Sequence, residues 1–132
     1  MTTENVLATQ DADLRTAGLQ ALREALPGVI PEGDIDLRDG RLGEELVEIG
    51  LISVWGQIWN REGLSKRDRS LVTISLLIAL RADAELRTHA RVAITNGVTK
   101  EEIAEVLYHA TGYTGFPAAV AAREVIREAL DS

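Results

Sequence analysis

Residues Val54–Leu80, VWGQIWNREGLSKRDRSLVTISLLIAL, carry the strongest structural signal in this chain. Two closely spaced tryptophans lead into a charged turn and then into an almost unbroken apolar run. Ser65 is a favourable N-cap residue, and Asp68 three positions later completes an Asp variant of the capping box. The run is therefore predicted to be a helix over about residues 66–81 rather than a buried strand. Because it is apolar on nearly every side, we expect it to be central or to lie at a subunit interface.

Helical patterns continue on both sides of this run, and no hairpin turn is flanked by alternating strands. The predicted helices span residues 11–26, 42–53, 66–81, 84–96, 100–112 and 117–130. Thr99 and Glu102 form a capping-box pattern before the fifth helix, and residues 113–116 are expected to form a turn before the last one. We predict an all-α fold of five or six helices, with a flexible N-terminal tail over residues 1–10 and a single domain over residues 11–132.

The charge and hydropathy of the chain exclude several kinds of function. A chain of 132 residues with a net charge of −7 and a pI near 4.8 is not suited to nucleic acid or to an anionic membrane surface, since both favour a basic face. The longest apolar run, residues 71–80, is too short to span a bilayer, and the first residues lack the features of a signal peptide. The expected location is the cytoplasm.

The residue types that are missing restrict the chemistry further. The chain has no cysteine, which excludes disulfides, thiolate metal sites and thiol redox chemistry. It also has no H-E-x-x-H motif, no glycine-rich nucleotide loop and no G-x-S-x-G nucleophile motif. An enzyme built on this chain is therefore expected to need no metal or other cofactor, and to rely on acid–base and electrostatic catalysis.

His89 is the first candidate for such chemistry. On a helix it shares a face with Leu86, Ala90 and Ala93, so its side chain is predicted to point inward. Two interpretations remain open. The imidazole is either a core histidine that bonds a backbone carbonyl, which is the commoner case, or an acid, base or oxyanion donor in a buried pocket.

An arginine and two tryptophans are also ambiguous. Arg69 falls at the fourth position of its helix, where it either pairs with Glu62 or Asp68 or clamps a substrate carboxylate. Trp55 and Trp59 stand four residues apart, so they are either core anchors or the wall of a pocket. Core anchoring is the more common role for such a pair.

His109 and Tyr108 are adjacent on a predicted helix, and the sequence does not decide which of the two faces outward.

Several segments together resemble the carboxymuconolactone decarboxylase family, in particular its 4-carboxymuconolactone decarboxylase branch. They are W-G-x-x-W-x-R at residues 55–61, R-S-L at 69–71, N-G-V-T-x-E-E-I at 96–103 and Y-x-G-x-P-A-A at 113–119. The resemblance implies an all-helical fold shared with alkylhydroperoxidase D-like proteins and a homo-oligomer, a trimer or hexamer. The redox branch of that fold uses a C-x-x-C pair, which this chain lacks.

The resemblance also implies an activity. Members of this branch convert 4-carboxymuconolactone to the β-ketoadipate enol-lactone through a dienolate, without a cofactor. By resemblance, His89 is the oxyanion donor or the acid, and Arg69 or Arg61 holds the remaining carboxylate of the small anionic lactone. Trp55 and Trp59 would wall the pocket. Two further side chains, those of Tyr113 and His109, are assigned to substrate binding.

One candidate catalytic residue departs from the branch, which often has glutamate at the position of Gln57. An amide does not titrate, so Gln57 cannot replace a glutamate that carries a proton. Two alternatives to the family reaction follow. One is a repurposed homologue acting on another lactone or cyclic acid as an isomerase, cyclase or hydrolase, and the other is a non-catalytic helical oligomer that binds a small acid.

Overall fold

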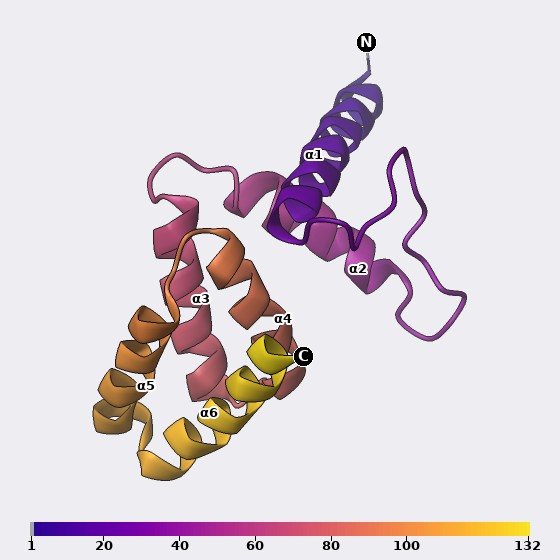
Figure 1. Cartoon of the computed structure of the whole chain (residues 1–132). Helices are drawn as coiled ribbons and strands as arrows, with labels where there is room; N and C mark the ends of the chain where they lie inside the picture. The colour runs from indigo at the N-terminus through magenta and orange to yellow at the C-terminus, as the bar shows by residue number, and fades with distance from the viewer. Residues whose placement is uncertain (1) are drawn as a thin grey trace. The chain divides into compact units, whose positions relative to one another are not determined.

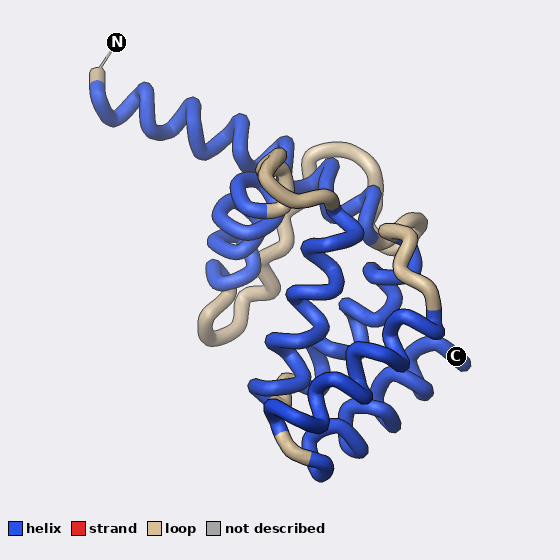
Figure 2. Tube along the Cα trace, turned by 90° about the vertical axis from the view of Figure 1, so that its left-hand side faces the viewer, coloured by secondary structure: helices blue, strands red, loops and turns tan. Residues whose placement is uncertain are grey.

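The computed structural model describes residues 2–132, and over these residues it consists of helices and loops with no strand (Figures 1 and 2). The elements are α1 (Thr3–Ala25), α2 (Glu45–Gly50), the π-helix η1 (Leu51–Ile58), α3 (Lys66–Leu80), α4 (Asp83–Thr95), α5 (Lys100–Thr114) and α6 (Phe116–Asp131). The predicted all-α fold is confirmed. None of the described helices is long and apolar enough to cross a membrane.

The chain has two compact units, which meet between Gly63 and Leu64. The first unit holds α1, α2 and η1, with α1 and α2 both packed on η1. The second holds α3 to α6. The two units are linked by a short exposed segment, residues 60–65, and each has its own packed helices.

The N-terminal end of the chain differs from the prediction. Helix α1 begins at Thr3, so the part of the expected tail that is described here is helical from that residue onward. The sequence gives a physical reason, because residues 3–12 contain neither glycine nor proline and the helical pattern that begins at Asp11 can extend backward without a break.

The second unit has a core to which all four of its helices contribute. Its buried residues are Ile74, Ile78, Leu86, Ala90, Ala93, Val98, Ile103, Leu107, Ala110, Ala122, Val125, Ile126 and Ala129. Many of them are alanines, especially on α4 and α6, and small side chains let the axes of packed helices come close together. Helix α4, which carries His89, contributes Leu86, Ala90 and Ala93 to this core.

The helix boundaries of the second unit follow local signals in the sequence. The Ser65 hydroxyl accepts a hydrogen bond from the Asp68 amide at 3.0 Å, which confirms the predicted start of α3. Thr99 and Glu102 form the complete predicted capping box at the start of α5. Each bond satisfies an amide that the first helical turn leaves without a partner.

The end of α5 differs from the prediction. The helix was expected to stop near Gly112 and a turn to follow over residues 113–116, but α5 continues to Thr114. Only Gly115 separates it from α6, and that glycine has φ 92°. A residue with positive φ is a common way to end a helix, and Gly115 rather than Gly112 takes that conformation.

In the first unit, the second predicted helix, residues 42–53, differs most from the structure. The spacing of Leu42, Leu46 and Ile49 favours a buried stripe on this helix, but all three side chains are largely exposed. Directly after α2 the helix changes to π-helical geometry. This geometry brings Leu51 and Gly56 to the buried face instead.

Candidate active site

His89 lies on the inner face of α4, as predicted, with 8% of its surface exposed. Burial lowers the pKa of the imidazole below its usual range, and the negative charge of Glu85 opposes this shift only in part. The side chain is therefore neutral at neutral pH. A neutral imidazole carries one N–H donor and one acceptor nitrogen, so His89 is equipped to donate to an oxyanion or to exchange a proton.

Arg69, on α3 of the same unit, is half-buried, and its Nε atom is buried. Asp68, one of the two acids suggested from the sequence, lies 3.5 Å from the guanidinium of Arg67, and Arg67 also pairs with Glu102. A half-buried guanidinium has less water around it than a surface arginine, which strengthens its interaction with a carboxylate.

A groove with a volume of about 870 Å³ runs along α3 and α5. The rings of His109 and Tyr113 stack within it, with their centroids 5.0 Å apart and their planes at 27°. Tyr108 also lines the groove, so the adjacent pair does not divide into one inward and one outward side chain. The full lining is Leu71, Ser75, Leu76, Ala79, Glu102, Glu105, Val106, Tyr108, His109, Ala110, Tyr113 and Thr114.

The charge of this groove is poorly matched to an anionic substrate. Its lining includes Glu102 and Glu105 but no lysine or arginine. Neither His89 nor Arg69 is among the lining residues. The structure therefore brings His109 and Tyr113 together in this groove, and it places His89 elsewhere in the unit.

In the first unit, Trp55 and Trp59 form a stacked pair with ring centroids 5.1 Å apart and planes at 15°. Trp59 is buried and Trp55 is half-buried. The core interpretation thus fits Trp59, whereas Trp55 keeps surface for another contact. Gln57 and Arg61 are both exposed.

Sequence reasoning missed the π-helix that carries these tryptophans. The amide of Trp59 donates to the carbonyl oxygen of Val54, five residues earlier, at 2.9 Å. Such helices are rare, and they occur frequently at functional sites. The signal in the sequence is Gly56, which sits between two tryptophans where a packed helix would not normally place a glycine.

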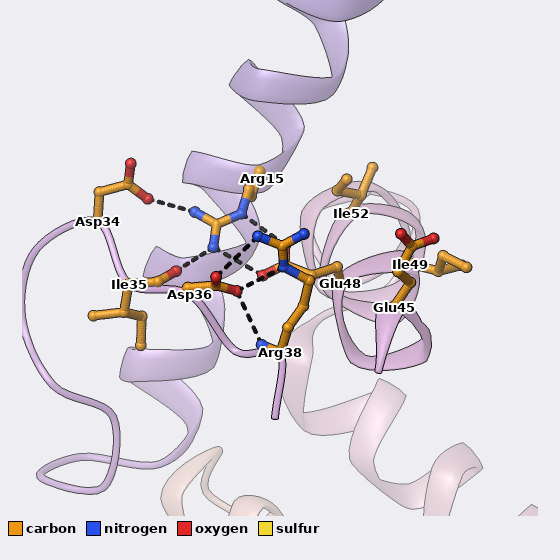
Figure 3. A pocket seen from close by; sticks show the side chains of 9 residues that line it. All are labelled: Arg15, Asp34, Ile35, Asp36, Arg38, Glu45, Glu48, Ile49 and Ile52. Atoms are coloured by element: carbon orange, nitrogen blue, oxygen red, sulfur yellow. Dashed lines mark hydrogen bonds and ion pairs between the residues drawn. The ribbon is translucent and has the colours of Figure 1, made fainter. Parts of the chain in front are cut away.

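The structure also reveals a polar pocket of about 540 Å³ in the first unit, which the sequence did not suggest (Figure 3). At its centre the Arg15 guanidinium donates to both carboxylate oxygens of Glu48, at 2.7 and 3.0 Å, and to Asp34 at 2.5 Å. It also donates to the carbonyl oxygen of Ile35. One arginine thereby ties the loop over residues 26–44 to both α1 and α2.

This pocket is a structural clasp rather than a site for an acid. Arg15 is committed to its acidic neighbours, which raise its pKa. Arg38 bonds Asp36 at 3.0 Å, which lowers the pKa of that carboxyl to about 2. The lining holds four acids against these two arginines, so it offers little attraction for an anion.

We expect Glu48→Gln to lower the free energy of unfolding by about 1–3 kcal/mol at neutral pH, because it removes a charge-assisted pair of hydrogen bonds. The bond from Arg15 lowers the pKa of Glu48 in the folded state. The contribution of the Glu48 carboxylate to the free energy of unfolding is present above the ordinary carboxyl pKa. It is lost as the pH falls through the lowered pKa of the folded state. Chemical denaturation from pH 7 to pH 3 measures both effects, with Glu45→Gln on the same helix as the control. Equal acid sensitivity in the two variants would contradict this role.

The described residues contain no group of three His, Cys, Asp or Glu side chains that could hold a metal ion. The side chains that could take part in a reaction are the neutral, buried imidazole of His89, the half-buried guanidinium of Arg69 and the stacked pair of Trp55 and Trp59. These residue types are suited to acid–base and electrostatic catalysis on an organic substrate.

Comparison with known proteins identifies the class more closely. The chain belongs to the carboxymuconolactone decarboxylase family, whose model matches residues 50–128. Over 74 residues it is 47% identical to 4-carboxymuconolactone decarboxylase of Acinetobacter baylyi, a match covering 56% of this chain and 55% of that protein. Over 111 residues it is 38% identical to a nitrosuccinic acid decarboxylase of Metarhizium robertsii, covering 84% of this chain and 68% of that protein. The chain thus spans only about half the length of the first of these relatives.

Proposed function

We propose that this protein is a decarboxylase that needs no cofactor and converts 4-carboxymuconolactone to the β-ketoadipate enol-lactone. Family membership and the 47% identity to a 4-carboxymuconolactone decarboxylase support the reaction and the substrate. The absence of cysteine removes the thiol chemistry that would be the main competing use of this kind of helical fold.

The chemistry of the substrate explains why so few groups are needed. When the ring carboxyl group leaves as carbon dioxide, its electron pair moves through the neighbouring double bond into the lactone carbonyl and forms a dienolate. A proton added at carbon then gives the enol-lactone. Because the lactone accepts the electrons itself, the protein has to hold the carboxylates, donate to the carbonyl oxygen and supply the proton.

The observation that carries this proposal is the buried, neutral imidazole of His89. In surroundings with little water, a hydrogen bond to a developing oxyanion stabilises it more than the same bond would in water. We assign this role, or that of the acid, to His89. Arg69 or Arg61 holds the carboxylate that remains, and Trp55 and Trp59 form an aromatic wall.

The other proposed site residues are weaker candidates on physical grounds. Gln57 is exposed and its amide does not titrate, so the proton has to come from another group such as His89. His109 and Tyr113 line a groove with two glutamates and no cation, which disfavours a substrate carrying two carboxylates.

Nitrosuccinic acid is a second candidate substrate. The relative named for that substrate matches 84% of this chain, a larger share than the lactone decarboxylase matches. Its nitro group is an electron acceptor beside a carboxyl group. The protein would again hold the carboxylates and supply a proton, and it would donate to a nitro oxygen in place of the lactone carbonyl oxygen. The two candidates share one reaction type and differ in the group that accepts the electrons.

The deciding experiment supplies each acid separately to the purified protein, without added metal, and follows carbon dioxide together with the organic product. The lactone is generated in situ. We expect stoichiometric carbon dioxide and enol-lactone from 4-carboxymuconolactone. Release from nitrosuccinic acid alone would favour the second candidate. Release from neither, by a folded sample, would contradict the decarboxylase proposal, and Gln57→Glu would then test whether the missing carboxyl group is the reason.

We also propose that the protein forms a homo-oligomer, a trimer or hexamer, in the cytoplasm. Val72, Leu76 and Leu80 lie four residues apart along α3, and their exposed fractions are 49%, 58% and 74%. Such a stripe of large apolar side chains is unfavourable in water and is typical of a surface that another subunit covers.

Leu76→Glu is accordingly expected to lower the molar mass measured by light scattering, because it places a charge in the middle of this stripe. Thr95→Glu, at an exposed position of α4, is the matched control and should leave the mass unchanged. A monomeric mass for the unmodified protein would contradict the proposed assembly.

A further inference from the structure

The crossing of α1 and η1 is a contact between two backbones. A methyl group added at Gly56 would lie 2.2 Å from the carbonyl oxygen of Leu14, and one added at Gly18 would lie 2.2 Å from that of Leu51. Both distances are far below any tolerated contact. The crossing therefore requires a glycine on each helix.

The π-helical geometry is what brings a glycine to this point. Residues five apart share a face in a π-helix, so Leu51 and Gly56 both face α1. In an α-helix the residue four positions after Leu51, which is Trp55, would come closest to that face. An indole cannot fit where two backbones meet. The π-turn brings Gly56 to this point, whereas in an α-helix residue 56 would face away from α1.

Trp55, next to this glycine, has a defined environment. It stacks on the buried Trp59 at 5.1 Å and remains half-buried itself. The Asn60 side-chain amide donates to the carbonyl oxygens of Trp55 and Gly56, at 3.2 and 3.1 Å. Those bonds hold the C-terminal end of the π-helix, so the indole is fixed by three features: the crossing, the stack and the asparagine.

We propose that the paired glycines and the π-turn are positioning elements that present Trp55 as the outer face of an aromatic wall, and that this wall binds a planar, conjugated acid. The inference rests on the proposed function and narrows it, because it favours a flat unsaturated lactone over a saturated acid. A conjugated ring can stack on an indole over its whole area, whereas a saturated chain makes only edge contacts.

The position of the pair can be measured without any activity. The chain has only two tryptophans, so an exciton couplet in the circular dichroism spectrum reports on Trp55 and Trp59 alone. We expect a couplet in the unmodified protein and its loss in Gly56→Ala. Gly50→Ala is the matched control, because a methyl group there meets nothing within 4 Å and the residue has ordinary helical geometry. It should keep the couplet.

Ligand binding is tested with two stable six-carbon dicarboxylates, conjugated cis,cis-muconate and saturated adipate. We expect muconate to quench the tryptophan fluorescence and to bind more tightly than adipate. Trp55→Ala, followed by competition or calorimetry, and Gly56→Ala should each weaken muconate binding about two- to tenfold, the range for one aromatic contact. Adipate binding should be nearly unchanged. For turnover, the same variants should raise KM more than they lower kcat.

A second pair of variants covers the case in which Gly56→Ala does not fold. Asn60→Asp removes the two amide donations without adding bulk, whereas Asn60→Gln keeps an amide. We expect the aspartate variant to lose part of the couplet and part of the muconate affinity, and the glutamine variant to recover both. Equal losses in the two would argue against the tether.

Three results would overturn the inference. They are an intact couplet in folded Gly56→Ala, unchanged muconate affinity after the couplet is lost, and equal affinity of the unmodified protein for muconate and adipate. These outcomes are separate from failure of the proposed function. If the couplet and the muconate preference are found but neither acid is decarboxylated, the wall is supported and only the assigned reaction is wrong.

Discussion

Replacing His89 with alanine is expected to lower turnover by at least about a hundredfold, the usual lower range for loss of an oxyanion donor or general acid. The reason is its position, since the imidazole is buried and neutral on the inner face of α4. Steady-state kinetics on the proposed substrate would measure the loss. KM should change less than kcat, because the bond is strongest when charge develops on the carbonyl oxygen.

The controls for this variant separate chemistry from folding. His89→Gln keeps a hydrogen-bond donor and most of the volume, so it should fold well and retain part of the activity if donation matters more than proton transfer. Thr95→Ala, at an exposed position of the same helix, should be fully active. Near-normal turnover in a folded His89→Ala protein would remove this residue from the site.

Stability should also depend on pH through His89. Because burial lowers its pKa in the folded state, the unfolded chain binds the proton first as the pH falls below the ordinary imidazole pKa, about 6.5. The contribution of His89 to the free energy of unfolding is therefore constant above the ordinary imidazole pKa, and it decreases as the pH falls below that pKa. His89→Gln should remove this part of the pH dependence.

Replacing Arg69 with lysine is expected to raise KM about tenfold to a hundredfold with a smaller change in kcat. The lysine keeps the charge but loses the planar fork that binds a carboxylate through two hydrogen bonds, and a charge-assisted bond contributes about 1.5–3 kcal/mol. Arg69 is half-buried, so water screens its interaction with a ligand only partly. Kinetics with the dicarboxylate substrate would measure the effect.

Arg87→Lys is a suitable comparison, because that arginine faces Glu128 across an exposed 3.4 Å contact and should be insensitive. If Arg69→Lys kept the original KM, the carboxylate would have to be held elsewhere. Arg61→Lys would then be the variant to measure, since that residue was assigned the same role.

The second unit was predicted well because its boundaries depend on neighbouring residues. The cap at Ser65, the capping box at Thr99 and the inward face of His89 all follow from spacings of three or four positions. Local chemistry decides such features, so one sequence is enough to predict them. The true end of α5 was missed because the sequence offers two glycines, and choosing between them requires the backbone angles.

The first unit was predicted poorly because contacts distant in sequence decide it. Gly56 takes its place at the crossing because of Gly18, thirty-eight positions earlier in the sequence. Periodicity assumes an α-helix and therefore assigned the wrong buried face around Leu46. The candidate site has the same weakness. The sequence identified titratable and aromatic residues, but it could not reveal that the groove containing His109 lacks a cation.

The arginine clasp has a consequence for how the chain could be divided. Between α1 and α2 the backbone runs through a long loop that is held by the side chains of Arg15 and Arg23, while α1 itself is held by its backbone contact with η1. A break in that loop would leave the first helix attached by packing instead of by covalent bonds. The loop is thus the natural place to split this protein into two fragments that reassemble, or to join new termini in a rearranged chain.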